Sequence, residues 1–271
     1  MSKQSGNETF WKARPETAGR VRGRIETILD WAAVREYRTG ENPARWRGHL
    51  KKALPEKNKV RKVRHHPALP FAQMGEFMAE LRAQQGVAAR ALEFTILSAA
   101  RANETIGAVP SEIDAEKAWN ISAIRMKAQR DHRVPLCDRA REIIKQTANA
   151  DWLFPAPDGR FLSSKAMAAV IDRMNDSREA RGLPRWVDPK QDGRDVVPHG
   201  FRSSFRDWAG ETTSFPLELA ESALAHAIKG KTEAAYARGS MFEKRRKLMD
   251  AWAAYCGRVP TSNNIVPMKH G

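Results

Sequence analysis

One short segment, residues 119–136, departs from the helical spacing of apolar residues that comes before and after it. Residues 119–124 and 132–136 are β-prone, and the polar turn 126–131 separates them. This pattern predicts a small hairpin. We therefore expect a mainly α fold with a small antiparallel β-sheet.

Helical spacing of apolar residues predicts an amphipathic helix over residues 16–34, with a basic side that includes Arg20 and Arg24. A turn at 40–46 and a short helix at 49–54 follow. After Pro67 the helical spacing of apolar residues returns. It predicts one helix that is closed by Gly86 and a second helix that ends near Arg101. Further helices are predicted at 139–148, 164–173, 199–209, 216–224 and 242–255, and the Gly-, Pro- and Asp-rich loop 181–198 is predicted to be mobile.

The charge balance points to a polyanionic partner. The 271 residues contain 47 Lys and Arg against 32 Asp and Glu, giving a net charge of +15 and a pI near 10.2. The mean hydropathy is −0.61 and no apolar run approaches the ~20 residues of a membrane span. We therefore expect a cytoplasmic protein that has nucleic acid as its leading partner and does not bind membranes.

Residues 51–66 (KKALPEKNKVRKVRHH) form a strongly basic linker. Such a run is often only a solvated stretch of charge, but its position between helical segments makes contact with the DNA backbone plausible. The candidate DNA-binding residues of this linker and the preceding helix are Arg20, Arg24, Lys51, Lys52, Lys59, Arg61, Lys62 and Arg64.

Cys137 and Cys256 stand in unrelated contexts, without a second Cys or a His at metal-binding spacing. We interpret both as small packing residues and expect neither a metal nor any other cofactor.

Polar motifs far apart in the sequence can supply the groups for metal-free phosphodiester transfer, which needs a nucleophile, cations around the non-bridging oxygens and an acid for the leaving 5′-hydroxyl. They are Ala100-Arg101 with Glu104, His199-Gly-Phe-Arg202, and Leu224-Ala-His226 followed ten residues later by Tyr236. His199 and Arg202 are three residues apart, so on a helix they project from one face.

Tyr236 differs from the other two tyrosines. Tyr37 lies in the N-terminal helical segment, and Tyr255 shares an apolar pattern with Trp252, so both are most simply packing residues. Polar and small residues surround Tyr236 instead.

The order Arg, His-x-x-Arg, His, Tyr resembles the catalytic set of the tyrosine recombinases, most closely the prophage and genomic-island integrases of the P4-like type, over residues 67–257. The resemblance implies the DNA breaking-rejoining fold and makes Tyr236 the nucleophile. It implies that Arg202 grips a phosphate oxygen, that His199 assists proton transfer or hydrogen-bonds the phosphate, and that His226 is a second phosphate donor rather than a satisfied core histidine. Lys127, in the predicted hairpin turn, becomes the general acid, although turn lysines are usually bystanders and Arg125 and Arg130 lie nearby.

The family usually has Arg-x-Gly-Glu at Arg101, where this chain has Asn103 in place of the glycine. Asn can adopt the left-handed backbone that glycine often supplies, and we read Glu104 as a structural partner of Arg101. Alternatively, Arg101 has only a structural role, in which its charge interacts with the dipole at the C-terminal end of a helix.

The resemblance implies three regions: a partial core-binding segment with the basic linker (1–66), the catalytic domain (67–257) and a C-terminal tail (258–271). No arm-binding domain is expected before the first region, so Met1 would begin a truncated form. Family behaviour implies a bacterial, nucleoid-associated protein that binds double-stranded DNA at attachment sites. It also implies a tetramer on two duplexes that is a monomer when free, and an excisionase or host DNA-bending protein as further partners.

The expected function is site-specific recombination through a 3′-phosphotyrosine intermediate, which integrates or excises a mobile element. Two alternatives remain at this point. One is an enzyme like a type IB topoisomerase, which reseals the same strand, and the other is a catalytically idle DNA-binding remnant of an integrase.

Overall fold

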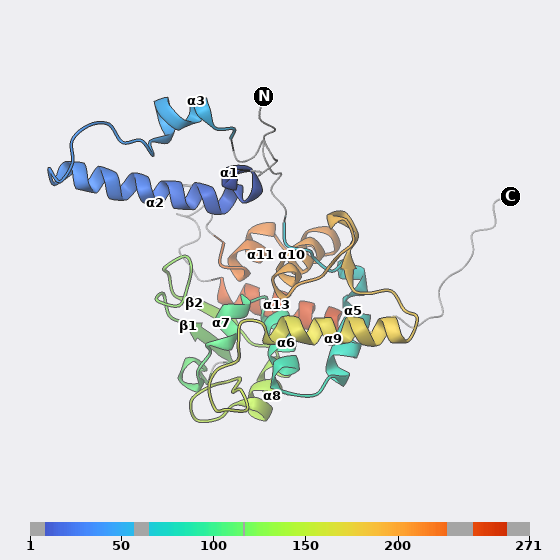
Figure 1. The fold of residues 1–271 in the computed structure, drawn as a ribbon. Helices are drawn as coiled ribbons and strands as arrows, with labels where there is room; N and C mark the ends of the chain where they lie inside the picture. Colours follow the sequence, from blue (N-terminus) through green and yellow to red (C-terminus); the bar gives the residue numbers. More distant parts are fainter. Residues whose placement is uncertain (1–8, 57–64, 116, 227–240, 259–271) are drawn as a thin grey trace. The chain divides into compact units, whose positions relative to one another are not determined.

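A computed structural model describes residues 9–56, 65–115, 117–226 and 241–258. The chain divides into two compact units, Met1–His65 and His66–Gly271 (Figure 1). Over the described ranges, none of the helices combines the length and the apolar character needed to cross a membrane.

The N-terminal unit is built on one long helix. Its helices are α1 (Phe10–Ala13), α2 (Pro15–Val34) and α3 (Lys51–Ala53), with an irregular helical turn at Trp46–Leu50. The rings of Trp11 and Trp46 stack with centroids 5.4 Å apart, and the buried Asn42 amide donates to the Glu26 carbonyl at 2.8 Å. These contacts hold the segment that contains Asn42 and Trp46 against α1 and α2.

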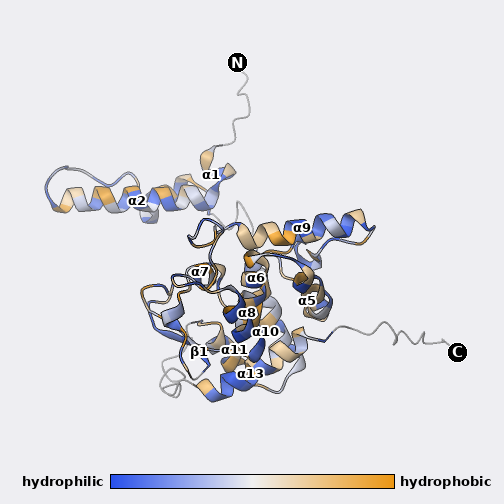
Figure 2. Cartoon of the chain, turned by 90° about the horizontal axis from the view of Figure 1, so that it is seen from below, coloured by the Kyte–Doolittle hydropathy of each residue, from blue (hydrophilic) through white to orange (hydrophobic). Residues whose placement is uncertain are grey.

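The predicted helix over 16–34 is confirmed, but large apolar side chains on it are exposed within this unit. Ile28, Trp31 and Val34 are 62%, 53% and 83% exposed, and Figure 2 shows hydrophobic and hydrophilic residues mixed along α2. The packing interpretation of Tyr37 was wrong, because this residue lies beyond the end of α2 and is 73% exposed, and its ring lies against that of Trp31, which is itself exposed.

The C-terminal unit is organised around a nearly fully buried helix, α6 (Val87–Ser98). The helices packed against it are α5 (Met74–Ala83), α7 (Ala102–Ile106), α8 (Asp138–Thr147), α9 (Ala166–Ala180) and α13 (Phe242–Cys256) (Figure 1). Trp252 is buried and donates to the Ile96 carbonyl at 2.9 Å, which ties α13 to α6. Cys137 and Cys256 are buried and free, as their interpretation as packing residues requires.

The predicted hairpin is confirmed. Strands β1 (Ala118–Ile121) and β2 (His132–Pro135) pair antiparallel, with Trp119 opposite Val134. The turn between them carries Lys127 at its exposed tip.

The prediction of a mobile loop over residues 181–198 was wrong. This segment contains a second small antiparallel pair, β3 (Val187–Asp188) with β4 (Arg194–Asp195). Trp186 is 2% exposed and carries the Arg178 guanidinium 3.8 Å from its ring centroid, so a buried aromatic anchors the segment despite its turn-rich composition.

Two other boundaries differ from the prediction. Helix α9 continues to Ala180 rather than ending at residue 173, and the helix expected over 199–209 begins later, as α10 (Phe201–Thr212). A tight 3₁₀ turn, Pro198–Gly200, precedes α10. His199 therefore lies in that turn, and only Arg202 lies in the helix. Helix α11 (Leu217–Ala223) completes the unit.

Candidate active site

Arg202 lies at the centre of the site, in the first turn of α10, and is 6% exposed. Its guanidinium donates to the carbonyl of Ala99 and, at 2.5 Å, to the carbonyl of Leu224. The residue just before the Ala100-Arg101 motif and the first residue of the Leu224-Ala-His226 motif thus each supply a backbone acceptor that orients Arg202. Burial lowers the pKa of Arg202 to about 10, the charge of Arg101 adds to this effect, and Glu104 and Glu221 oppose it.

Arg101 lies between α6 and α7 with a side chain 20% exposed. Its guanidinium donates to Glu104 at 2.7 Å, and the second carboxylate oxygen accepts from the Arg101 backbone N–H at 2.9 Å. The structural role expected for Glu104 is confirmed. The left-handed residue of this turn is Ala99 (φ 50°), not Asn103, which lies inside α7, so that expectation was wrong.

His226 follows α11 after a left-handed residue, Ala225 (φ 49°). Its Nε2 lies 3.3 Å from the Arg202 guanidinium, and its Nδ1 lies 2.5 Å from a Glu221 carboxylate oxygen. A guanidinium has no acceptor, so Nε2 accepts, and in the neutral ring Nδ1 carries the proton and donates to Glu221. Burial acts to raise the pKa of Glu221, but hydrogen bonds from Arg206 and His226 outweigh it and leave that pKa below its usual value.

His199 is exposed, in the 3₁₀ turn that leads into α10. Its pKa is lowered to about 4, first by desolvation of the ring and then by the positive charges of His66, Arg202, Arg101 and Lys127. The ring is therefore neutral at pH 7 and can accept a proton.

Lys127 lies in the turn between β1 and β2, and its charge contributes to lowering the pKa of His199. Arg125 donates to the carbonyl of Glu104 and pairs with Glu112. Because these bonds hold Arg125 in place, Lys127 is a better candidate than Arg125 for the general acid.

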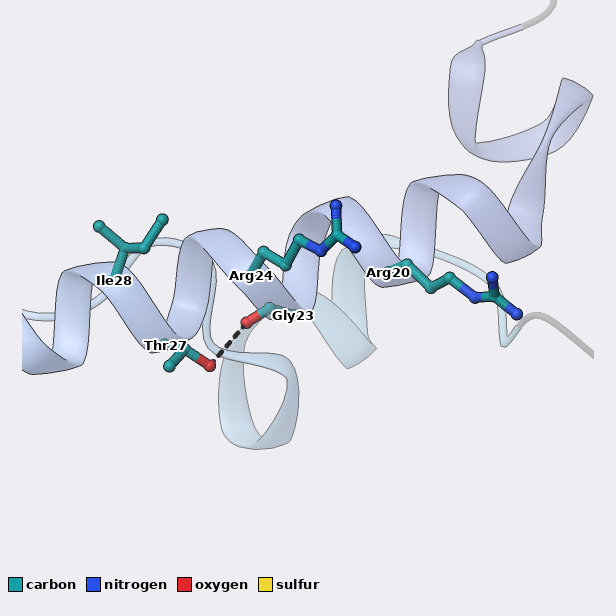
Figure 3. Close-up of a pocket in the computed structure, with 5 residues that line it drawn as sticks. All are labelled: Arg20, Gly23, Arg24, Thr27 and Ile28. Atoms are coloured by element: carbon teal, nitrogen blue, oxygen red, sulfur yellow. Dashed lines mark hydrogen bonds between the residues drawn. The ribbon is translucent and has the colours of Figure 1, made fainter. Parts of the chain in front are cut away.

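Tyr236, the expected nucleophile, lies outside the described residues, as do Lys59, Arg61, Lys62 and Arg64. The described candidates for DNA contact, Arg20, Arg24, Lys51 and Lys52, are all exposed in the N-terminal unit. Figure 3 shows Arg20 and Arg24 on one side of α2, where they line a shallow pocket with Gly23, Thr27 and Ile28.

Sequence reasoning missed His132, which begins β2. Its Nε2 donates to the Ala223 carbonyl at 3.2 Å, which connects the hairpin to the end of α11. Burial, followed by the charge of Arg245, lowers the pKa of His132 to about 4. No local pattern in the sequence marks such a residue, because its partner lies 91 positions away.

His66 was also missed, because the sequence analysis placed it only at the end of a basic run. Its ring lies against that of His199, with centroids 4.5 Å apart.

A helical domain with a small hairpin, in which segments far apart in sequence gather two arginines, a lysine and histidines around one point, has the architecture of a tyrosine recombinase catalytic domain. The comparisons with known proteins agree. The model of the phage integrase family matches residues 68–242, and that of the phage integrase central domain matches residues 7–49. The chain belongs to the phage integrase family, the tyrosine-type site-specific recombinases.

Among curated relatives, the integrase of Enterobacteria phage P4 is 30% identical over 260 residues, which is 89% of this chain and 55% of that protein. Prophage integrase IntA of Escherichia coli K12 is 29% identical, over 88% of this chain and 54% of its own length. The chain thus spans about half the length of these relatives.

Solved structures share the fold at low identity. The integrase from mycobacterium phage Brujita superposes with a TM-score of 0.52 at 16% identity, covering 94% of this chain and 79% of that one. A lambda integrase dimer bound to a COC′ core site gives 0.54 at 13% identity, over 84% and 61% of the two chains.

Proposed function

We propose that this protein is a site-specific DNA recombinase that cleaves and rejoins DNA strands through a 3′-phosphotyrosine intermediate and so integrates or excises a mobile element. The observation that carries the proposal is the Arg202 guanidinium, buried and aimed by the carbonyls of Ala99 and Leu224. Arg101 stands close enough to lower the pKa of Arg202.

The like charges of Arg101 and Arg202 repel each other, Glu104 offsets part of this repulsion, and an anion bound by both guanidinium groups would offset more of it. A scissile phosphate supplies that anion, and the negative charge grows as the phosphorus becomes pentavalent. Donors fixed before the reaction stabilise this state without having to reorganise, which typically contributes about 3–4 kcal/mol for each donor. Arg101 and Arg202 would take this role. His226 would donate to the phosphate from Nε2 only as the doubly protonated ring, because in the neutral ring its one N–H is donated to Glu221.

In the cleavage step, the Tyr236 hydroxyl oxygen attacks the phosphorus and the bond to the 5′-oxygen breaks. The phenol proton passes to His199, whose ring is neutral at pH 7. Lys127 gives a proton to the departing 5′-oxygen, which leaves as a hydroxyl. The reverse step, with a 5′-hydroxyl of a partner strand as the attacking group, releases Tyr236 and joins the strands.

DNA would be held by the exposed basic residues of the N-terminal unit, Arg20, Arg24, Lys51 and Lys52, together with Lys59, Arg61, Lys62 and Arg64. Lambda integrase has been solved as a tetramer bound to a Holliday junction. We propose the same assembly on two duplexes for this protein, with regions 1–66, 67–257 and 258–271 as core-binding segment, catalytic domain and tail.

The test is strand cleavage of a nicked suicide duplex that carries the attachment site. After denaturing electrophoresis, the wild-type chain and the Tyr255→Phe variant should give a band of protein covalently bound to DNA, and Tyr236→Phe should give none. Tyr255 is the matched control, because its ring packs on Trp252 with centroids 6.0 Å apart and it has no part in the site.

A covalent band from Tyr236→Phe would move the nucleophile elsewhere. DNA binding without any covalent product from the wild-type chain would identify an idle remnant. Resealing of the same strand without strand exchange would identify activity like that of a type IB topoisomerase.

A further inference from the structure

The start of the C-terminal unit is in unusually close contact with the 3₁₀ turn that carries His199. A Cβ on Gly200 would lie 1.8 Å from the Pro67 carbonyl oxygen and 2.9 Å from the Ala68 Cα. Gly200 itself has an ordinary helical backbone (φ −62°, ψ −29°), so close approach, and not backbone freedom, requires glycine here. The Val197 N–H donates to the Pro67 carbonyl at 3.4 Å.

Further bonds continue this attachment. The Ala68 N–H donates to the buried Asp188 carboxylate at 2.8 Å, and the Ser204 hydroxyl donates to the Leu69 carbonyl at 2.5 Å. The segment that begins at His66 is therefore fixed to β3, which precedes the His199 turn in the chain, and to α10, which follows it.

This attachment places the His66 imidazole on that of His199. The centroids are 4.5 Å apart and the planes are inclined by 59°. Within the described part of the chain, the His66 ring has no hydrogen-bond partner, and its one ring contact is His199. The charged groups that face His199 are His66, Arg202, Arg101 and Lys127.

We propose that His66 is a positioning residue of the strand-cleavage site, which acts through its ring contact and its charge to keep His199 unprotonated. The inference rests on the proposed function, in which neutral His199 accepts the nucleophile's proton. The contribution of His66 comes second only to desolvation among the causes that lower the pKa of His199 to about 4. Loss of the His66 charge therefore raises the pKa of His199, and the ring begins to charge at a higher pH.

The first measurement needs no cleavage. Nuclear magnetic resonance of the ¹⁵N-histidine-labelled full chain, without DNA, follows the titration of His199 in the wild type and in variants. His66→Phe keeps an aromatic ring and removes the charge, so the His199 midpoint should move to higher pH. His66→Lys keeps a cation and should retain the low midpoint, and His65→Phe is the matched control on the neighbouring residue.

The second measurement is the pH profile of single-turnover strand cleavage. His66→Phe should move the acid limb to higher pH, with a loss of at least about threefold near pH 5.5 and a change within about twofold at pH 8. His66→Lys should restore the wild-type profile. Circular dichroism checks that each variant is folded.

The two measurements separate the possible failures. An unchanged His199 midpoint in folded His66→Phe overturns the inference whether or not the protein cleaves DNA. A raised midpoint with an unmoved acid limb also overturns it, because His66 would then not matter for cleavage. A wild-type chain that forms no covalent product contradicts the proposed function, and the titration still reports on the contact between the rings.

Discussion

The contact between Gly200 and Pro67 gives the sharpest prediction, which concerns Gly200→Ala. The new Cβ would meet the carbonyl oxygen at 1.8 Å and the carbonyl carbon at 2.7 Å, whereas contacts under 3.0 Å are essentially never seen. The Pro67 carbonyl cannot retreat alone, because hydrogen bonds to Asp188 and Ser204 hold the residues that follow it.

Overpacking of a single group typically costs about 1–3 kcal/mol, and a clash between two backbone segments belongs at the upper end or beyond. We expect Gly200→Ala to lower the free energy of unfolding by about 3 kcal/mol or more. For a domain of this size, each kcal/mol shifts the melting temperature by about 2–4 °C, so the C-terminal unit should melt about 6–12 °C lower.

Differential scanning calorimetry of the full chain at pH 7.5 measures this shift. Gly210→Ala is the matched control, since Gly210 also lies in α10 and its added Cβ would meet only a Leu217 methyl group at 3.8 Å. That variant should melt at or slightly above the wild-type temperature, because alanine favours a helix by about 0.5–1 kcal/mol over glycine. A Gly200→Ala protein that melts within about 2 °C of the wild type would refute the close approach and the placement of His66 that depends on it.

Three further predictions concern charge. Arg202→Lys should lower the rate of covalent attachment at least about 100-fold while noncovalent DNA affinity stays within about threefold, because an ammonium keeps the charge but loses the planar pair of donors. The melting temperature should fall as the pH drops from about 6.5 toward 4. The reason is that His132 and His199 have folded-state pKa values lowered to about 4, so the unfolded chain binds more protons than the folded chain in this pH range. His132→Gln should make the melting temperature depend less steeply on pH, and an unchanged dependence would contradict the burial of neutral His132. Replacing Lys51 and Lys52 with alanine should reduce the slope of log affinity against log salt by about 0.9 for each DNA phosphate that the protein no longer neutralises, and an unchanged slope in a salt titration would remove both from the DNA interface.

The sequence by itself determined the elements with a strong local period. The helix around Val87–Ser98, the long helix Pro15–Val34 and the hairpin at residues 118–135 follow from apolar spacing and turn chemistry, which depend on near neighbours in the chain. The segment 181–198 was misread for the same reason, because its turn-rich composition is local and the burial of Trp186 is not.

The sequence also predicted candidate residues of the site by motif, but only the tertiary structure decided how the described ones are held. Arg202 depends on the carbonyls of Ala99, 103 positions away, and of Leu224, 22 positions away. Every residue carries a carbonyl, so no residue type marks the ones that are used. The pairing of His66 with His199 has the same origin: it depends on a glycine whose missing side chain lets two distant backbone segments approach each other, a condition that exists only once the chain is folded.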